Sequence, residues 1–430
     1  MPDSTQLSTL ASHHHSLTTP HVPARTPLDV HASLRASPGR ALAVGLCLGA
    51  ALLMAGAAHA WDGIVEKQVF EMEEYTTRGG ETIADLAVGW EAYGTLNEAR
   101  DNAILITHFF SGTSHAAGRY EEEGPAGYWD SIIGPGKPLD TDQFYIIASD
   151  TLVNLNAHDP KVTTTGPAST HPETGEPWGL DFPVVTIGDF VDVQKALLES
   201  QGIERLHAVM GASMGALQAY EWASTYPERV ERLIPVIGAG EADPWLLATL
   251  AAWAAPIRVD ASWNGGDYYD GEPPLDGLRE ALKLVTLNAN HWLWANETFD
   301  RSWADEEADP ARDLDARYAI EQTLDDIAAA RAEVADANHL LYLVRANQTF
   351  MAGYGESLEA GLAAIEAPTL MLYSEDDLVF APQSVRRTAE LIAADGTPVE
   401  LVPLTGTRGH LDGVVAIDQA GDRLRAFLAH

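Results

Sequence analysis

Short runs of apolar and β-branched residues alternate along the chain with segments whose apolar residues recur at helical spacing. The helical pattern covers residues 187–201, 216–226 and 382–394. The apolar runs fall at 103–110, 143–150, 206–213, 232–239, 368–375 and 399–406. Continuous apolar runs separated by helices are typical of parallel strands that are covered on both faces. The pattern therefore predicts an α/β fold with one open, mostly parallel sheet flanked by helices.

The pattern changes between residues 240 and 365, where helical segments follow one another without an apolar strand between them. Such an insertion is expected above the carboxyl ends of the strands, where ligands enter an open α/β sheet. We therefore predict four parts of the chain: a leader at 1–60, a first part of the core at 61–239, a helical cap or lid at 240–365, and a second part of the core at 366–430.

The leader carries the features of a secretory signal peptide. Arg35 and Arg40 precede the apolar run ALAVGLCLGAALLMAGA, and Ala58 and Ala60 follow as small residues at a cleavage site. The run is shorter than the ~20 residues that span a bilayer comfortably, which weighs against the alternative of a transmembrane anchor. The single cysteine, Cys47, lies in this run, so the processed chain would contain no thiol. We expect a periplasmic or secreted protein without stable membrane insertion after processing.

The net charge of the chain argues against some classes of binding partner. The chain has 63 acidic and 26 basic residues among 430, a formal net charge of -37. Nucleic acids and anionic membrane surfaces are themselves polyanions, so the charge argues against both as partners. The 46% hydrophobic content is enough for a sizeable core. These features indicate a globular protein with a solvated acidic surface and a small-molecule substrate.

The stretch LHAVMGASMGALQAYEWA at 206–223 contains a G-x-S-x-G motif centred on Ser213. A short apolar run precedes Ser213 and a helical pattern follows it, which is the strand–turn–helix context of a nucleophile elbow. Glycines at 211 and 215 fit a strained turn that passes close to a neighbouring strand. The alternative is a serine that caps the helix. We predict that Ser213 is a nucleophile.

A serine hydroxyl needs a base and an orienting carboxylate, which follow the serine in the chain order of this motif. Asp377 follows the run PTLMLYSE, and His410 follows the run VELVPL, so both stand where a strand end would deliver them to the same edge. Asp376 is the competing carboxylate. We prefer Asp377 because the segment LVFAP after it keeps the usual offset from the acid to an apolar residue and a proline.

An oxyanion requires two preorganised N–H donors. We predict that Met214, directly after the nucleophile, supplies one donor and that Phe110, in the loop after an early strand, supplies the other, with Phe109 as the alternative. His108 and His115 lie in the same loop, but no acidic ligands accompany them at metal-binding spacing. We expect no cofactor and no metal.

Several blocks of the sequence together resemble the homoserine O-acetyltransferase family of α/β-hydrolase-fold enzymes. The blocks are THFFSGTSHAAG, IGPGKPLDTDQFYIIASD, TTTGPASTHPETGEPWGLDFPVVTIGDFV, GASMGALQAYEWA, DASWNGGDYYDGEPPLDGL and DANHLLYLVRAN. The resemblance extends from roughly residue 66 to residue 425. It implies a Ser213–His410–Asp377 triad, acyl transfer through an acyl-serine, and a homodimer that pairs through the cap.

The chain departs from the resemblance where the acceptor would bind. The family implies an arginine and a tyrosine in the helix after a P-x-x-G-L block, and an aspartate directly after the histidine. Those positions hold Leu282, Ala289 and Leu411 here, and Lys283 and Asp412 lie one position away. An amino acid is a zwitterion, and an unpaired buried charge is costly. The pocket is therefore expected to be apolar unless the alignment shifts by one residue.

These observations favour an exported serine hydrolase, carboxylesterase-like, that cleaves small or medium acyl esters through an acyl-serine intermediate. Export would also separate the chain from cytoplasmic acetyl-CoA. The alternative is a homoserine O-acetyltransferase or a related O-acyltransferase that uses acetyl-CoA. A binding protein that retains the fold is a third hypothesis, against which the complete set of three catalytic residues weighs.

Overall fold

The computed structural model describes residues 61–355 and 357–429, so the predicted leader lies outside the described residues. An eight-stranded sheet runs in the order β1-β2-β6-β3-β7-β8-β9-β10, and β4 pairs with β5 separately. The strands are β1 (Gln68–Thr76), β2 (Thr82–Tyr93), β3 (Ala103–Thr107), β4 (Ile133–Gly134), β5 (Leu139–Asp140), β6 (Tyr145–Ser149), β7 (Ala208–Ala212), β8 (Leu233–Val236), β9 (Thr369–Ser374) and β10 (Val399–Leu404).

Six strands of the main sheet correspond to the six apolar runs of the sequence. From β6 through β3, β7, β8 and β9 to β10, every neighbouring pair is parallel. This confirms the predicted α/β class with a mostly parallel sheet. The strands β1 and β2 were not predicted; they form an antiparallel hairpin, and β2 joins β6 in antiparallel register. Most of the β1 side chains are exposed, so this edge strand lacks an apolar run.

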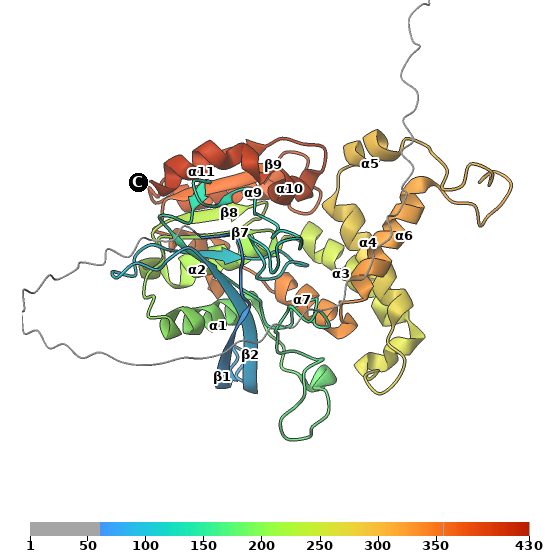
Figure 1. The fold of residues 1–430 in the computed structure, drawn as a ribbon, viewed down its shortest axis with the longest axis horizontal. Coiled ribbons are helices and arrows are strands. Elements are labelled where there is room, and N and C mark those ends of the chain that lie inside the picture. The colour runs from blue at the N-terminus through green and yellow to red at the C-terminus, as the bar shows by residue number, and fades with distance from the viewer. Residues whose placement is uncertain (1–60, 356, 430) are drawn as a thin grey trace, which may run out of the picture. The chain divides into compact units, whose positions relative to one another are not determined.

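Helices cover both faces of the sheet (Figure 1). Leu105 and Val209 point into one apolar cluster, while their neighbours Ile106 and Met210 point into the other. The first cluster includes residues of α1 (Ile187–Ser200), α2 (Met214–Thr225) and α9 (Pro382–Ala393), and the second includes residues of α11 (Gly421–Leu428). Period-two alternation of buried side chains explains why the strand sequences are apolar throughout.

Helices also fill the segment between β8 and β9. They are α3 (Pro244–Val259), α4 (Leu275–Ala289), α5 (Trp292–Phe299), α6 (Ala319–Ala332), α7 (Ala337–Gln348) and α8 (Leu358–Ala363). α3 packs against α4 and α7, and α4 packs against α6 (Figure 1). No described residue of this segment belongs to the main sheet. The domain boundaries proposed from the sequence stay a prediction. In the described ranges, no helix is long and apolar enough to cross a membrane.

An arginine in the β1–β2 turn ties the hairpin to the helices beneath it. Arg78 donates through Nε to Asp192 on α1 (2.9 Å) and through Nη1 to Glu221 on α2 (2.5 Å). Its backbone N–H donates to Asp189 (2.7 Å). The Glu221 side chain is fully buried and also accepts from the N–H of Gly353 (3.0 Å). Arg78 therefore supplies the cation that a buried carboxylate requires.

Arg78→Ala should destabilise the fold, because it leaves Glu221 buried without its cation. Removing one partner of a buried ion pair typically costs about 3 kcal/mol or more in the free energy of unfolding. Urea denaturation of the full chain measures the change. Arg279→Ala is the control, since Arg279 and its partner Asp276 are both exposed and a surface pair contributes at most about 1 kcal/mol. Equal, small losses in the two variants would contradict the role of Arg78.

Candidate active site

Ser213 stands in a sharp turn between β7 and α2, in the middle of the parallel sheet. Its backbone is strained, with φ 56° and ψ -118°. A Cβ atom at Gly215 would lie 2.1 Å from the carbonyl oxygen of Thr107 on β3, so only glycine fits where α2 starts. Ser213 occupies the position before the helix, but its side chain accepts no capping hydrogen bond. The geometry is that of an elbow, and not that of a capping serine.

The structure brings the three predicted catalytic side chains together. Ser213 Oγ lies 2.9 Å from His410 Nε2, and His410 Nδ1 lies 2.8 Å from Asp377 Oδ2. The other oxygen of Asp377 accepts from the backbone N–H groups of Val379 (2.8 Å) and Phe380 (2.9 Å). All three side chains are buried. A serine, an imidazole and a carboxylate therefore form one hydrogen-bonded chain, as nucleophilic catalysis by serine requires.

Of the two competing aspartates, Asp377 contacts His410. Asp376 instead faces His291, whose Nε2 lies 4.0 Å from the Asp376 carboxylate, and half of the Asp376 side chain (49%) is exposed. A single position along the chain thus separates a buried carboxylate from an exposed one. The sequence preference for Asp377 agrees with this geometry.

The loop that carries His410 is fixed by a second aspartate. Asp412 is buried and accepts from the backbone N–H of Gly409 (2.9 Å) and more weakly from that of Arg408 (3.4 Å). Burial raises the pKa of the Asp412 carboxyl group, while these N–H donors oppose the rise. Gly409 has φ 64°, and a Cβ atom there would lie 2.6 Å from the carbonyl oxygen of Asp376. Asp412 therefore positions the loop.

A cavity of about 310 Å³ opens beside Ser213 and His410. Helices α3, α4 and α6 supply much of its wall. The other lining residues are Phe109, Phe110, Ser111, Ile237, Trp253, Val285, Thr286, Ala289, Asn290, Ile327, Arg331, Arg408, Leu411 and Val414. Most of these side chains are apolar, as expected from the sequence, but two arginines are among them.

The residues that line the cavity can be compared with the three positions at which the family's anchors are replaced. Ala289 and Leu411 line it, as the alignment predicts, whereas Leu282 is fully buried in the core and is absent from the lining. Lys283 also lies outside the lining and pairs with Asp325 (2.8 Å). Asp412 accepts a hydrogen bond from the backbone of the loop that carries His410. Both polar residues that lie one position away are thus engaged elsewhere, so a shift of one residue in the alignment does not restore the family's anchors.

Arg331 and Arg408 were not predicted as site residues. The helical spacing of the sequence could have identified Arg331. It follows Ile327 by four residues, which places both side chains on one face of α6. A charged residue on the inward face of a helix is unusual and indicates a specific role. Arg408 precedes His410 by two residues and lacks a comparable signal.

The loop at 108–118 lies along the cavity and carries the predicted oxyanion donor. Phe109 and Phe110 both line the cavity, and Phe110 packs edge-to-face on Trp253 with 5.4 Å between ring centroids. Met214 is the first residue of α2, so its N–H has no partner within the helix. The side-chain amide of Gln218 donates to the His108 carbonyl (3.3 Å) and holds the start of the loop. The assignment of Met214 and Phe110 as donors stays a prediction.

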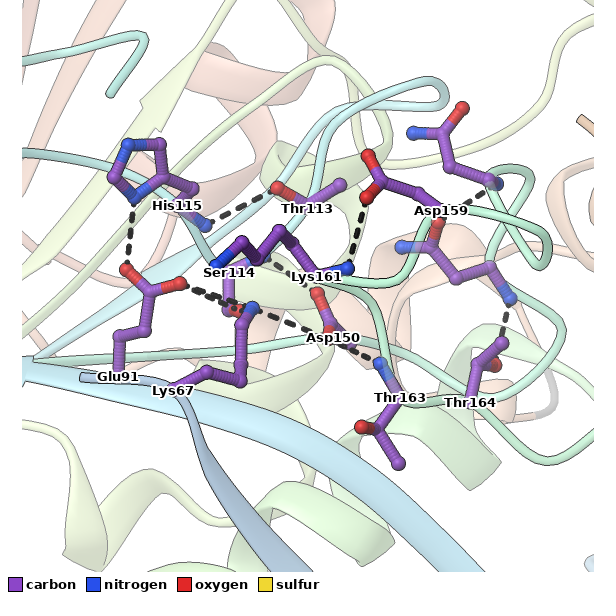
Figure 2. A network of polar contacts seen from close by, with 12 residues as sticks. Lys67, Glu91, Thr113, Ser114, His115, Asp150, Asp159, Lys161, Thr163 and Thr164 are labelled. Atoms are coloured by element: carbon purple, nitrogen blue, oxygen red, sulfur yellow. Dashed lines mark hydrogen bonds and ion pairs between the residues drawn. The ribbon is translucent and has the colours of Figure 1, made fainter. Parts of the chain in front are cut away.

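A buried ion-pair network anchors the far end of this loop (Figure 2). Lys67 Nζ lies 2.9 Å from Glu91 and 3.4 Å from Asp150. Glu91 also contacts His115 Nδ1 at 3.0 Å, and Asp150 accepts from the Ser114 N–H at 2.7 Å. His115 is therefore part of a structural network. Over residues 61–355 and 357–429, no group of three or more His, Cys, Asp or Glu side chains is placed to hold a metal ion.

Comparison with known proteins places the chain among α/β hydrolases. A family model of the α/β hydrolase fold matches residues 124–411. Homoserine O-acetyltransferase of Symbiobacterium thermophilum is 37% identical over 353 residues, which are 81% of this chain and 90% of the relative. The solved homoserine O-acetyltransferase of Bacillus anthracis is 36% identical with a TM-score of 0.81, over 85% of this chain and 98% of that one. The solved esterase E22 is 52% identical with a TM-score of 0.81, over 85% of this chain and 100% of that one.

These comparisons confirm the α/β-hydrolase fold and the resemblance found in the sequence, and they correct the function. Relatives named homoserine O-acetyltransferase are 33–37% identical over 81–86% of the chain. The prediction of an exported carboxylesterase was therefore wrong, and its acyltransferase alternative is favoured, although esterase structures are also similar. The error was to let three replaced anchor positions outweigh a similarity that extends over most of the chain; the cavity lining also includes two arginines, which the sequence analysis did not consider. The predicted location stays a prediction.

The Glu91 network generates a pH-dependent prediction. Burial by itself raises the pKa of Glu91, but contacts with His115, Lys67 and Tyr120 outweigh it and lower the pKa from 4.5 to about 2. A carboxyl group with a lowered folded-state pKa stabilises the fold above its unfolded pKa, and this contribution is lost as the pH falls through the folded value. Glu91→Gln should therefore lower the free energy of unfolding by about 3 kcal/mol at neutral pH.

The difference between Glu91→Gln and the wild type should shrink as the pH falls from 4.5 towards 2. Urea denaturation at a series of pH values measures it. The exposed Glu98 provides the control variant, Glu98→Gln, whose stability should follow the wild type at each pH. A loss in Glu91→Gln that stays constant with pH would show that the network does not depend on the Glu91 charge.

Proposed function

Because the chain belongs to the homoserine O-acetyltransferase family of α/β-hydrolase-fold enzymes, we propose that it transfers an acetyl group from acetyl-CoA to the hydroxyl group of homoserine. The hydrogen-bonded chain of Ser213, His410 and Asp377 beside a cavity of about 310 Å³ carries the proposal. A cavity of that size matches a small acceptor. The similarity to relatives of this name over most of the chain supports the choice of acceptor.

In the first half of the proposed reaction, Ser213 Oγ attacks the carbonyl carbon of the thioester while His410 Nε2 takes the hydroxyl proton. Asp377 holds the imidazole through Nδ1 and stabilises the imidazolium that forms. The carbon–sulfur bond then breaks, and the CoA sulfur leaves with the proton from His410. The products of this step are an acetyl ester on Ser213 and free CoA.

In the second half, the acceptor hydroxyl gives its proton to His410 and attacks the acetyl carbonyl carbon. The bond to Ser213 Oγ breaks, and His410 returns the proton to Ser213. The N–H groups of Met214 and Phe110 are proposed to stabilise the oxyanion in both halves. Water competes for the acetyl-serine, so transfer requires that contacts in the cavity hold the acceptor in place.

The first experiment supplies the purified full chain with acetyl-CoA, with and without L-homoserine. Release of CoA is followed with a thiol reagent, and O-acetylhomoserine is identified by mass spectrometry. We expect CoA release that depends on homoserine and one molecule of product per CoA. Equal release without the acceptor would mean that water takes the acetyl group, and would overturn the proposal.

Variants of the hydrogen-bonded chain test the assigned roles. Ser213→Ala should abolish acetyl transfer, and Asp377→Asn should lower kcat by about 10⁴-fold because the imidazole loses its orienting carboxylate. Asp376→Asn is the matched control one position away, and should retain near-normal kcat because Asp376 faces away from His410. Steady-state rates of CoA release measure all three. A larger loss in Asp376→Asn than in Asp377→Asn would reverse the assignment.

A further inference from the structure

Three residues that line the catalytic cavity each carry a side-chain polar atom that has no hydrogen-bond partner within the described part of the chain. The atoms are Nη2 of Arg331, Nε of Arg408 and Oδ1 of Asn290, and all are buried. The three residues line the cavity, whereas no Asp or Glu does. In a chain with a net charge of -37, the cavity is therefore cationic. Buried polar atoms without partners indicate groups that a ligand would satisfy.

Arg331 is the best placed of the two arginines to receive an anion. It extends from α6, and its Nη1 donates to Thr286 Oγ1 on α4 (2.9 Å), which fixes one side of the guanidinium group. No salt bridge joins Arg331 to a described carboxylate. Burial lowers the pKa of Arg331 to about 10, so the group still carries its charge at neutral pH. An unpaired buried cation is costly unless an anion joins it.

Arg408 is less suited to this role. Its guanidinium group lies over the ring of Trp294, 4.9 Å from the centroid. Burial lowers the pKa of Arg408, and the nearby Asp412 carboxylate opposes this by favouring the charged form. The ring and the carboxylate already compensate part of its charge. Arg331 has a single hydroxyl partner and no such compensation.

Asn290 provides the complementary acceptor. Its amide nitrogen donates to the Thr286 carbonyl (2.8 Å), which leaves Oδ1 as the free atom of the side chain. Thr286 and Asn290 lie four residues apart, so they share one face at the end of α4 with Ala289, which also lines the cavity. A cation on α6 and a neutral acceptor directly after α4 therefore belong to neighbouring elements, because α4 and α6 pack against each other.

We propose that Arg331 binds the carboxylate of the acceptor through its guanidinium group and that Asn290 Oδ1 accepts a hydrogen bond from the acceptor's ammonium group. This inference rests on the proposed function. It assigns the recognition of the carboxylate to α6, and not to the α4 positions of Leu282 and Ala289. A planar guanidinium matches the two oxygens of a carboxylate, so an arginine suits this role better than a lysine would.

The decisive test compares two acceptors, L-homoserine and 3-aminopropan-1-ol, which shares the hydroxyl and ammonium groups but lacks the carboxylate. In Arg331→Met, the KM for homoserine should rise about 10- to 100-fold with kcat little changed, because a hydrogen-bonded charge pair is lost. The KM for 3-aminopropan-1-ol should stay unchanged. Asn290→Leu should raise the KM for both acceptors. Arg317→Met, which removes an arginine outside the cavity lining, is the control and should alter neither KM.

A thermal melt separates recognition from a structural role. Arg331→Met should be at least as stable as the wild type, because it removes an unpaired buried charge. Marked destabilisation together with equal losses for both acceptors would overturn the inference. A rise in KM confined to homoserine in Arg408→Met, with none in Arg331→Met, would overturn it as well.

A binding measurement distinguishes failure of the inference from failure of the proposed function. Calorimetry with 4-hydroxybutanoate, which carries a carboxylate and a hydroxyl group, needs no turnover and uses Ser213→Ala with and without Arg331→Met. We expect the affinity to fall about 10- to 100-fold when Arg331 is replaced. Turnover of homoserine with equal KM in wild type and Arg331→Met would overturn the inference and leave the function intact. No turnover, with binding that depends on Arg331, would overturn the function and support the inference.

Discussion

The hydrogen bonds that join Ser213, His410 and Asp377 depend on a constraint of the parallel sheet. Side chains delivered from the ends of β7, β9 and β10 meet because the carboxyl ends of parallel strands lie along one edge. The backbone of Ser213 is strained at the elbow. Gly215 has no side chain, which allows α2 to start close to β3. The sheet therefore fixes the reacting groups to within hydrogen-bonding distance before any substrate binds.

Support for these groups comes from two buried electrostatic arrangements of different kinds. Glu91 and Lys67 anchor the loop that carries Phe110, and Asp412 accepts from the backbone of the loop that carries His410. In both places a buried carboxylate is paired with donors, as the cost of burying a charge requires. The cavity is the exception, because Arg331 and Arg408 enter it without a carboxylate in the lining. Of the two, Arg331 has no described carboxylate partner, which is the basis of the anion site that we propose.

The similarity to both acetyltransferases and esterase E22 has a physical explanation. An acyl-serine formed on this fold reacts with whichever hydroxyl group reaches it, whether from an alcohol or from water. The fold and the proposed chemistry of an acyl-serine serve either reaction, so the contacts that hold the acceptor decide the outcome. Here α4 and α6, in the segment between β8 and β9, supply several residues of the cavity lining.

The sequence by itself determined the parallel sheet and the positions of Ser213, Asp377 and His410, because apolar runs and a strand–turn–helix motif are local patterns. It did not predict the β1–β2 hairpin, since the exposed strand β1 lacks an apolar run and is held by remote partners of Arg78. Nor did it predict the role that we propose for Arg331, because the alignment compared positions along one helix, whereas Arg331 lines the cavity from another helix, α6. Only the tertiary structure decided which residues line the cavity and which of their buried polar atoms lack a partner, since burial and pairing depend on side chains that are distant in the sequence.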